Sequence, residues 1–259
     1  AKVNGTSWSY TDTRTLADGD HDYQVRVVDQ AGNVGATTSQ VVTVDTKAPQ
    51  YGITIDAISD DTGQSGSDFI TNDTSLTVSG TLGSELRSDE RVQISLDGGA
   101  TWIDVTVNHT QWSYTDTRTL TDNDYTYQVR IIDQAGNVGS TAQQVVTVDT
   151  TPPVTKGTIV SYTDTDGERT GVFGENVSTD DTTPLISGTL NQGLAAGEIA
   201  QLYRDGVLLG QVTMNGATSW YFQDSGLRDV NHNYVLRITD VAGNYTDSND
   251  FVLKVDTSI

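Results

Sequence analysis

Short stretches of the chain alternate between apolar and polar residues with a period of two, the pattern of half-buried strands. Segments 127–131 (YQVRI) and 145–148 (VVTV) are clear cases, rich in β-branched and aromatic residues. Asp, Asn and Gly punctuate such runs, as at 97–99, 122–124 and 135–137. In the middle of the chain this pattern predicts seven short strands and no helix, near 52–57, 75–81, 91–97, 102–107, 111–116, 126–132 and 143–149.

The strand pattern recurs because the sequence repeats itself. Residues 8–49 and 112–153 are identical at 31 of 42 positions, and residues 220–257 form a diverged third copy. The front halves also match, since 71–82 (TNDTSLTVSGTL) corresponds to 179–190 (TDDTTPLISGTL). We therefore divide the chain into a first unit at 1–45, a middle unit at 46–149 and a third unit at 150–259. The first unit holds only a back half, and with a start at Ala1 we expect a fragment of a longer protein.

Seven short strands in about 105 residues, separated by regular turns, favour an immunoglobulin-like β-sandwich. The chain has no Cys, so the usual disulfide of that fold is missing, and Trp112 and Tyr127 must supply core area instead. The linkers 46–49 (TKAP) and 150–153 (TTPP) are short and stiff. The predicted fold class is all-β, with tandem immunoglobulin-like domains in a rod-like array.

Composition narrows the range of functions. The chain has 14 Lys plus Arg against 35 Asp plus Glu, a formal charge of −21, and 30 of the 35 acids are Asp. Asp favours turns over helix interiors, so the charge indicates an acidic surface carried by loops. Nucleic acid and anionic membranes are poor partners for it, since both require clustered Lys and Arg. The sequence contains no apolar run of 18 residues, so it predicts no membrane span.

Three motifs give the chain a specific resemblance. They are D-Q-A-G-N-V-G at 29–35 and 133–139, V-D-T-x-x-P at the end of the first two units, and I-T-N-D-T-S-L-T-V-S-G-T at 70–81. In these it resembles the bacterial Ig-like repeats of type I-secreted giant non-fimbrial adhesins, such as those of Salmonella. The resemblance implies a secreted or cell-surface, monomeric rod: a Ca²⁺-stiffened stalk whose units contact their neighbours. Distal repeats would then reach the host cell, through its glycans.

The carboxylates can be placed at the ends of the units from the strand order. Asp133 lies in the turn before the last strand of the middle unit, so it faces backward toward Asp45, which ends the first unit. Asp240 and Asp149 form the same pair at the second junction. Two carboxylates about 4 Å apart repel by roughly 4 kcal/mol at an effective dielectric near 20. Lys and Arg are scarce nearby, and Ca²⁺ takes six to eight oxygen ligands, so we expect a Ca²⁺ ion at each junction.

Other acidic turns are candidates for further ligands or separate sites. Each Asp could instead only cap its own turn, because its side chain accepts a hydrogen bond from the backbone two residues on. Ca²⁺ suits flexible, Asp-rich loops better than Mg²⁺ does. These further candidates are Asp18, Asp20, Asp122, Asp124, Asp60, Asp61, Asp164 and Asp166.

A catalytic role is not expected. His21, His109 and His232 occupy non-equivalent loop positions and lack a repeated Ser or Cys partner, which is typical of surface histidines. Paired carboxylates can serve a glycosidase, but that chemistry needs a cleft, which narrow repeat sandwiches rarely provide.

The aromatic residues leave a binding role open. Trp8, Trp112 and Trp220 are equivalent positions, so the pattern favours core packing over sugar stacking for them. Trp102 has no Trp counterpart in the third unit, and packing within its own hairpin competes there with a sugar-binding role. Two alternatives to the stalk therefore remain: an array of carbohydrate-binding modules, or an accessory region of a secreted polysaccharide-degrading enzyme.

Overall fold

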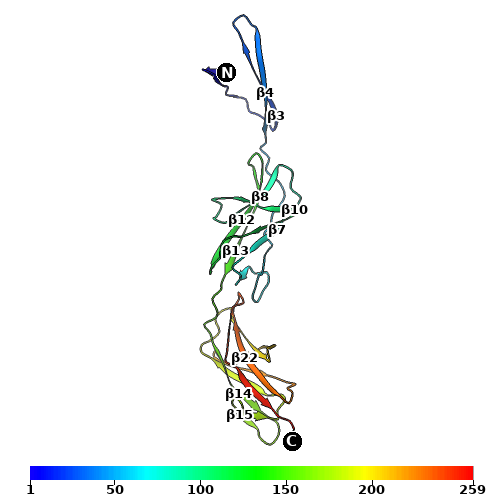
Figure 1. The fold of residues 1–259 in the computed structure, drawn as a ribbon, viewed down its shortest axis with the longest axis vertical. Coiled ribbons are helices and arrows are strands. Elements are labelled where there is room, and N and C mark those ends of the chain that lie inside the picture. Colours follow the sequence, from blue (N-terminus) through cyan, green and yellow to red (C-terminus); the bar gives the residue numbers. More distant parts are fainter. Residues whose placement is uncertain (259) are drawn as a thin grey trace.

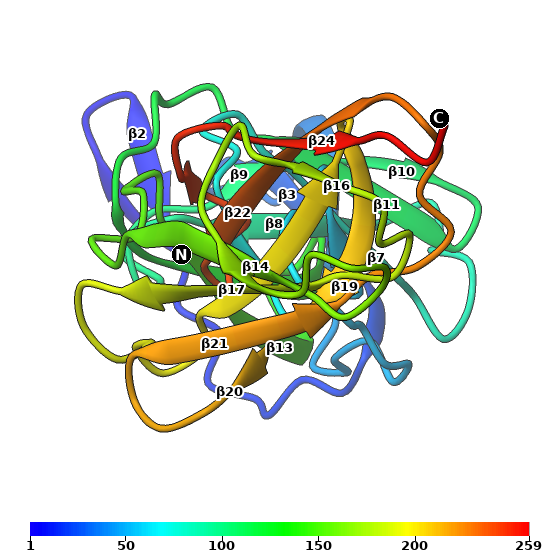
Figure 2. The same ribbon diagram turned by 90° about the horizontal axis from the view of Figure 1, so that it is seen from below.

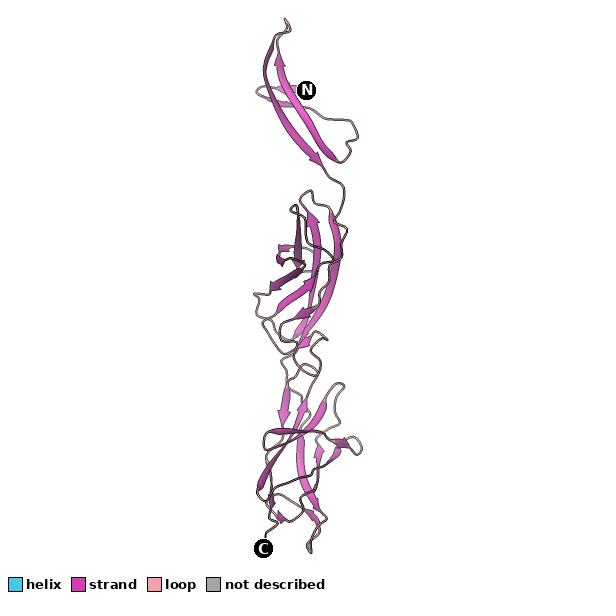
Figure 3. Ribbon diagram, turned by 90° about the vertical axis from the view of Figure 1, so that its right-hand side faces the viewer, coloured by secondary structure: helices cyan, strands magenta, loops and turns pink. Residues whose placement is uncertain are grey.

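The computed structural model describes residues 1–258 as three β-units strung along one axis, with the two termini at opposite ends (Figure 1). Viewed along that axis, the units project onto one another (Figure 2). All regular structure within 1–258 is strand, which confirms the predicted all-β class (Figure 3). None of these residues forms a helix long and apolar enough to cross a membrane.

The middle unit is a sandwich of a four-stranded and a five-stranded sheet. The first sheet has the order β10-β11-β7-β5 and the second has the order β6-β13-β12-β8-β9. All pairs are antiparallel except β6 with β13. The strands are β5 (Ala57–Ile58), β6 (Ile70–Thr71), β7 (Thr77–Thr81), β8 (Glu90–Ser95), β9 (Ile103–Asp104), β10 (Thr106–Asn108), β11 (Gln111–Thr115), β12 (Asn123–Asp133) and β13 (Val138–Val148).

The third unit repeats this arrangement. One sheet has the order β15-β14-β17-β21-β20, and the other has β16-β24-β22-β18-β19, with β23 beside β22. Its strands are β14 (Gly157–Asp164), β15 (Gly171–Phe173), β16 (Ser178–Thr179), β17 (Leu185–Leu190), β18 (Ile199–Arg204), β19 (Val207–Gln211), β20 (Thr213–Met214), β21 (Ser219–Gln223), β22 (Asn231–Thr239), β23 (Tyr245–Asp247) and β24 (Phe251–Val255).

The first unit contains counterparts of β10 to β13 and no others. They form two separate hairpins, β1 (Lys2–Asn4) with β2 (Ser7–Ser9), and β3 (Gly19–Val28) with β4 (Val34–Val44). The apolar side chains that a complete sandwich would bury are therefore exposed in the first unit. Trp8 is 51% exposed, whereas its counterparts Trp112 and Trp220 are each 2% exposed.

The cores of the two complete units form as the sequence predicts. Trp112 and Tyr127 are both fully buried and belong to one cluster with the apolar residues of β7, β8 and β12. The Trp112 ring lies against Gly80 of β7, where a Cβ atom would meet both the ring and the carbonyl oxygen of Thr54. The indole N–H of Trp112 donates to that same carbonyl at 3.0 Å. Gly80 is thus the site of a close approach between strand and ring.

Two of the predicted strands are interrupted in the structure. The segment 102–107 splits at Val105 into β9 and β10, which belong to different sheets. The segment 52–57 runs beside β7 through hydrogen bonds from Thr54 and Asp56, but only its end forms regular strand. The chain then crosses to the other sheet as β6, a strand the sequence pattern does not predict because two residues have no period.

The expectation of a surface position is wrong for His232. It is 6% exposed and is the second residue of the long strand β22, where its ring contacts the Asp205 carboxylate at 2.6 Å. The carboxylate gives the buried ring nitrogen a partner, which is what burial of a polar side chain requires. His109 is exposed as expected and contacts Glu85 at 2.8 Å.

Candidate functional site at the junctions between units

The first junction is closed by the turn between β12 and β13. Asn137 donates its backbone N–H and its side-chain amide to the two carboxylate oxygens of Asp133, each at 2.8 Å. The same amide nitrogen reaches the preceding unit and donates to the backbone carbonyl of Asp45 at 3.0 Å. The turn requires a positive φ, which Gly136 supplies at +97°. One side chain thus ties its own turn to the end of the unit before it.

The second junction repeats this geometry residue for residue. Asn244 donates its backbone N–H and side-chain amide to the Asp240 carboxylate at 2.9 and 3.1 Å. Its amide nitrogen also donates to the carbonyl of Asp149 at 2.7 Å. A further hydrogen bond joins the Thr246 hydroxyl to the carbonyl of Pro153 at 2.9 Å. Both junctions therefore share an asparagine bridge from turn to linker.

The second junction has an additional clamp, formed by the loop between β5 and β6 of the middle unit. The Thr62 hydroxyl donates to the carbonyl of Ala242 at 2.7 Å, and the Gln64 backbone N–H donates to the carbonyl of Val241 at 3.2 Å. The Gln64 side chain adds hydrogen bonds to carbonyls of the third unit. Gly63 lies between these two donors with a φ of +95°, and a Cβ atom there would collide with the Val241 carbonyl.

The buried carboxylate of the first junction is held in its charged form by the same asparagine. Asp133 is 3% exposed. Burial alone opposes ionisation, but the hydrogen bonds from the Asn137 side chain and backbone outweigh it and keep the pKa of Asp133 below its ordinary value. The equivalent turn of the first unit has the same pattern, and hydrogen bonds from Asn33 lower the pKa of Asp29.

The structure brings together the residues of both predicted pairs, but not their carboxylates. Asp45 and Asp149 contribute backbone carbonyls to the junctions. Their carboxylates turn back to accept the N–H groups of Lys47 and Thr151, each at 2.9 Å. The expected cluster of acids at a junction is therefore replaced by an amide nitrogen between a carboxylate and a carbonyl. Within residues 1–258, no group of three or more His, Cys, Asp or Glu side chains is placed so that it could hold a metal ion.

The acidic segments 18–20 and 122–124, which run into the starts of β3 and β12, contact threonines of the strand ends and linkers. Asp122 accepts the Thr150 backbone N–H at 2.8 Å, and the hydroxyls of Thr150 and Thr151 lower its pKa. Asp124 accepts the Thr147 hydroxyl at 2.7 Å. Asp18 and Asp20 make the equivalent contacts with Thr46 and Thr43 in the first unit. Among the other candidates, the buried Asp164 accepts from Thr179 and from the backbone of Asp166.

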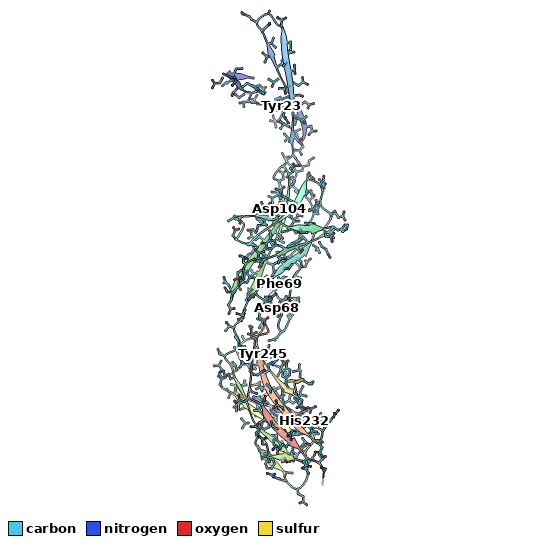
Figure 4. All side chains as sticks on the ribbon, in the orientation of Figure 1. Tyr23, Asp68, Phe69, Asp104, His232 and Tyr245 are labelled. Carbon is cyan, nitrogen blue, oxygen red and sulfur yellow. The ribbon has the colours of Figure 1, made fainter. Side chains whose placement is uncertain are left out.

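Asp61 is the one candidate ligand with a buried carboxylate oxygen that lacks a hydrogen-bond partner among residues 1–258. One of its oxygens accepts the Phe69 N–H at 3.1 Å, while the other is buried and has no partner among the described residues. Burial raises the pKa of the Asp61 carboxyl, and the charge of Asp68 raises it further. Asp60 and Phe69 flank the loop with positive φ values of 47° and 63°. Asp68 and Phe69 lie at the end of the middle unit that faces Tyr245 and the third unit (Figure 4).

The two bridging asparagines and the clamp were not predicted as site residues. A signal for the asparagines exists in the sequence, since Asn33, Asn137 and Asn244 close the same A-G-N tripeptide in all three copies. The clamp has no such signal. Its residues Thr62, Gly63 and Gln64 occur in one loop only, and their role depends on where the next unit docks.

Comparisons with known proteins agree with the architecture. The family model of the bacterial Ig-like domain matches the sequence at residues 1–46, 48–150 and 156–257. A curated relative, Exoglucanase B of Cellulomonas fimi, is 33% identical over 252 residues, which cover 92% of this chain and 20% of that protein. The chain thus spans about a fifth of the length of this relative.

The solved structures to which the chain is similar are distant from it in sequence. The fibronectin(III)-like modules of Clostridium thermocellum CbhA are 14% identical with a TM-score of 0.43, covering 73% of this chain and 88% of that one. The latent dimeric PorU of Porphyromonas gingivalis is 13% identical with a TM-score of 0.29, covering 88% of this chain and 26% of that one.

Proposed function

Since this chain belongs to the bacterial Ig-like domain family, we propose that it is a non-catalytic, stiff spacer in a secreted or surface-displayed bacterial protein. The observation that carries the proposal is the asparagine bridge found at both junctions, from Asn137 to Asp45 and from Asn244 to Asp149. Domains joined by short linkers normally move relative to one another unless their interface holds them. Directional hydrogen bonds across each linker oppose that motion.

The narrower proposal is a stalk of a bacterial adhesin, which holds distal repeats away from the cell so that they can reach host glycans. It rests on the likeness of the D-Q-A-G-N and V-D-T motifs to adhesin repeats. A second candidate is an accessory region of a polysaccharide-degrading enzyme, and the relationship to Exoglucanase B favours it. The two candidates share the spacer role and differ in what the spacer connects.

Replacing Asn244 with Leu is expected to loosen the second junction alone. The change removes the amide donor to the Asp149 carbonyl and the Asp240 carboxylate, contacts worth about 1–3 kcal/mol when a buried partner is left unsatisfied. The chain has no Cys, so spin labels can be placed at single cysteines introduced at Thr121 and Val207, which are both exposed. We expect the distance distribution between them to broaden.

Two matched variants control this experiment. Asn33→Leu removes the equivalent side chain in the first unit, whose hydrogen bonds stay within its own turn. The distance distributions across both junctions should therefore keep their width. Asn137→Leu should broaden only a distance measured across the first junction, between labels at Thr37 and Thr121. A narrow second-junction distribution in Asn244→Leu would contradict the bridge as the source of stiffness.

We also propose that Ca²⁺ stiffens the chain, at the loop around Asp61 rather than at the asparagine bridges. At the bridges an amide nitrogen already satisfies the carboxylate and the carbonyl, so these residues do not fit the ion as they stand. Asp61 fits better, because a buried carboxylate oxygen lacks a partner and the Asp68 charge is close by. Ca²⁺ would supply the positive charge that this part of the loop lacks, beside the clamp on the third unit.

Replacing Asp61 with Asn separates this proposal from simple turn capping. Without Ca²⁺ the change removes carboxylate repulsion, so the melting temperature of the middle unit should rise by about 2–4 °C, as for about 0.5 kcal/mol in a small domain. In the unaltered protein, Ca²⁺ at ten times Kd should add about 1.4 kcal/mol, and in Asp61→Asn it should add nothing. Calorimetry with Ca²⁺, Mg²⁺ and chelator measures both effects. Asp89→Asn, an exposed acid of the same unit, is the control, and an equal Ca²⁺ response in both variants would refute the site.

A further inference from the structure

The outer face of the five-stranded sheet in the middle unit carries an arginine, Arg130, that has no carboxylate partner among residues 1–258. Val129 and Ile131 of β12 point into the core, so Arg130 between them points outward. Its Nε and Nη2 both donate to the side-chain oxygen of Gln93, at 3.0 and 2.7 Å. A guanidinium has five N–H donors. Within residues 1–258, the hydrogen bonds of Arg130 engage only two of them.

An aromatic ring and a second arginine lie beside Arg130. Its guanidinium stacks on the ring of Trp102, with 4.0 Å between the Arg130 Cζ and the ring centroid. Trp102 is half-buried, so part of its ring stays accessible. Arg91 lies nearby and contacts the exposed Asp104 at 3.3 Å. Burial, and then the charge of Arg91, lower the pKa of Arg130, as expected for a cation that lacks a partner anion.

The third unit shows what completes this arrangement. Arg237 is the counterpart of Arg130: it lies opposite Gln201 on one neighbouring strand and opposite Asp247 on the other. The Asp247 carboxylate accepts two hydrogen bonds from Arg237, at 2.7 and 2.8 Å. Rings stack on this guanidinium too, with Tyr245 at 3.6 Å and Tyr203 at 4.9 Å. The third unit thus places its own carboxylate on a ring-stacked arginine.

In the middle unit that carboxylate is missing. The residue opposite Arg130 on β13 is Thr141, where the third unit has Asp247. The surrounding chain carries a formal charge of −21, but this patch has two arginines and one aspartate. A carboxylate from outside fits an arginine of this kind by charge and by its paired N–H donors.

We propose that the outer face of the middle unit, at Arg130 and Trp102, binds a carboxylate-bearing sugar, a uronic acid residue of an acidic polysaccharide. The sugar carboxylate neutralises Arg130 as Asp247 neutralises Arg237, but it binds the Nη1 and Nη2 hydrogens that Gln93 leaves free. The ring of Trp102 gives the sugar an amphipathic surface to lie against. The side-chain amides of Gln128 and Gln143, which pair at 3.0 Å on the same face, supply donors and acceptors for hydroxyl groups. This site does not depend on the proposed role of the chain as a spacer.

The test compares binding of an acidic trisaccharide before and after a carboxylate of the chain itself is placed beside Arg130. Trigalacturonic acid is titrated into the full chain by calorimetry, and the Trp102 indole N–H is followed by NMR. Thr141→Asp copies the third unit and places a carboxylate beside Arg130, so it should weaken binding by about tenfold or more. Trp102→Ala should do the same. The reverse change, Asp247→Thr, should release Arg237 and create a second binding site for the trisaccharide.

Further measurements separate uronate binding from misfolding and from unspecific attraction of anions. Thermal unfolding of Thr141→Asp must match that of the unaltered chain, which removes misfolding as a cause. Equal binding of neutral cellotriose would overturn the role of the carboxylate, and equal binding of a tri-glutamate peptide would overturn the sugar. Trigalacturonate binding that survives Thr141→Asp, or no saturable binding in the millimolar range, would overturn the site altogether.

Discussion

Replacing Gly63 with Val is expected to release the third unit from the middle unit while both sandwiches stay folded. A Cβ at this position would collide with the Val241 carbonyl, and the φ of +95° is strained for a β-branched residue. The loop must therefore move away from the turn that contains Val241. Its hydrogen bonds from Thr62 and Gln64 to the third unit would be lost together. This is a larger change than the loss of the single Asn244 bridge.

Spin-label distances between Thr121 and Val207 measure the effect, and they should broaden more in Gly63→Val than in Asn244→Leu. Gly66→Val is the matched control, since it lies in the same loop but a Cβ there meets only the Asp61 carbonyl at an ordinary 3.7 Å. Each variant should keep both calorimetric transitions. If Gly63→Val left the distances as narrow as those of Gly66→Val, the loop would not be a clamp.

The sequence pattern predicts the sandwiches well because their burial follows local rules. The alternation in β12 and β13 and the position of Trp112 correctly indicate which side chains enter the core. Two features depend instead on long-range geometry. The split of 102–107 at Val105 and the crossing of the chain to β6 reflect which sheet edge is available, and no period in the sequence records that.

At the junctions, too, one part could be predicted from the sequence and another could not. Strand order alone is enough to place Asp133 opposite Asp45 and Asp240 opposite Asp149. It does not determine which atoms meet, because that depends on rotamers and on backbone direction at the end of a strand. Asp45 caps the linker through the Lys47 N–H, as Asp commonly does in turns, so its carbonyl is left for the asparagine. Counting charges therefore finds the junction but misses the neutral side chain that closes it.

Replacing Trp112 with Ala is expected to cost the middle unit about 3–5 kcal/mol of unfolding free energy, the usual range for removing a large buried aromatic residue. Trp112 is 2% exposed, packs on Gly80 and donates to the Thr54 carbonyl, so the change leaves both a cavity and an unpaired acceptor. A domain of this size commonly has a stability of only about 5–15 kcal/mol, so this loss is a large fraction of the total. In calorimetry, one transition should move down while that of the third unit stays in place.

The repeat supplies the control for this experiment. Trp8 is the same residue in the same motif, but it is 51% exposed, so Trp8→Ala should change unfolding free energies by no more than about 0.5 kcal/mol. The contrast follows from the neighbours of the two rings, since β7 covers Trp112 and the first unit has no counterpart of β7. A third unit that melted together with the Trp112→Ala middle unit would mean that the junctions transmit unfolding as well as orientation. In that case the rod would be one cooperative body, and its units could not be treated as separately stable.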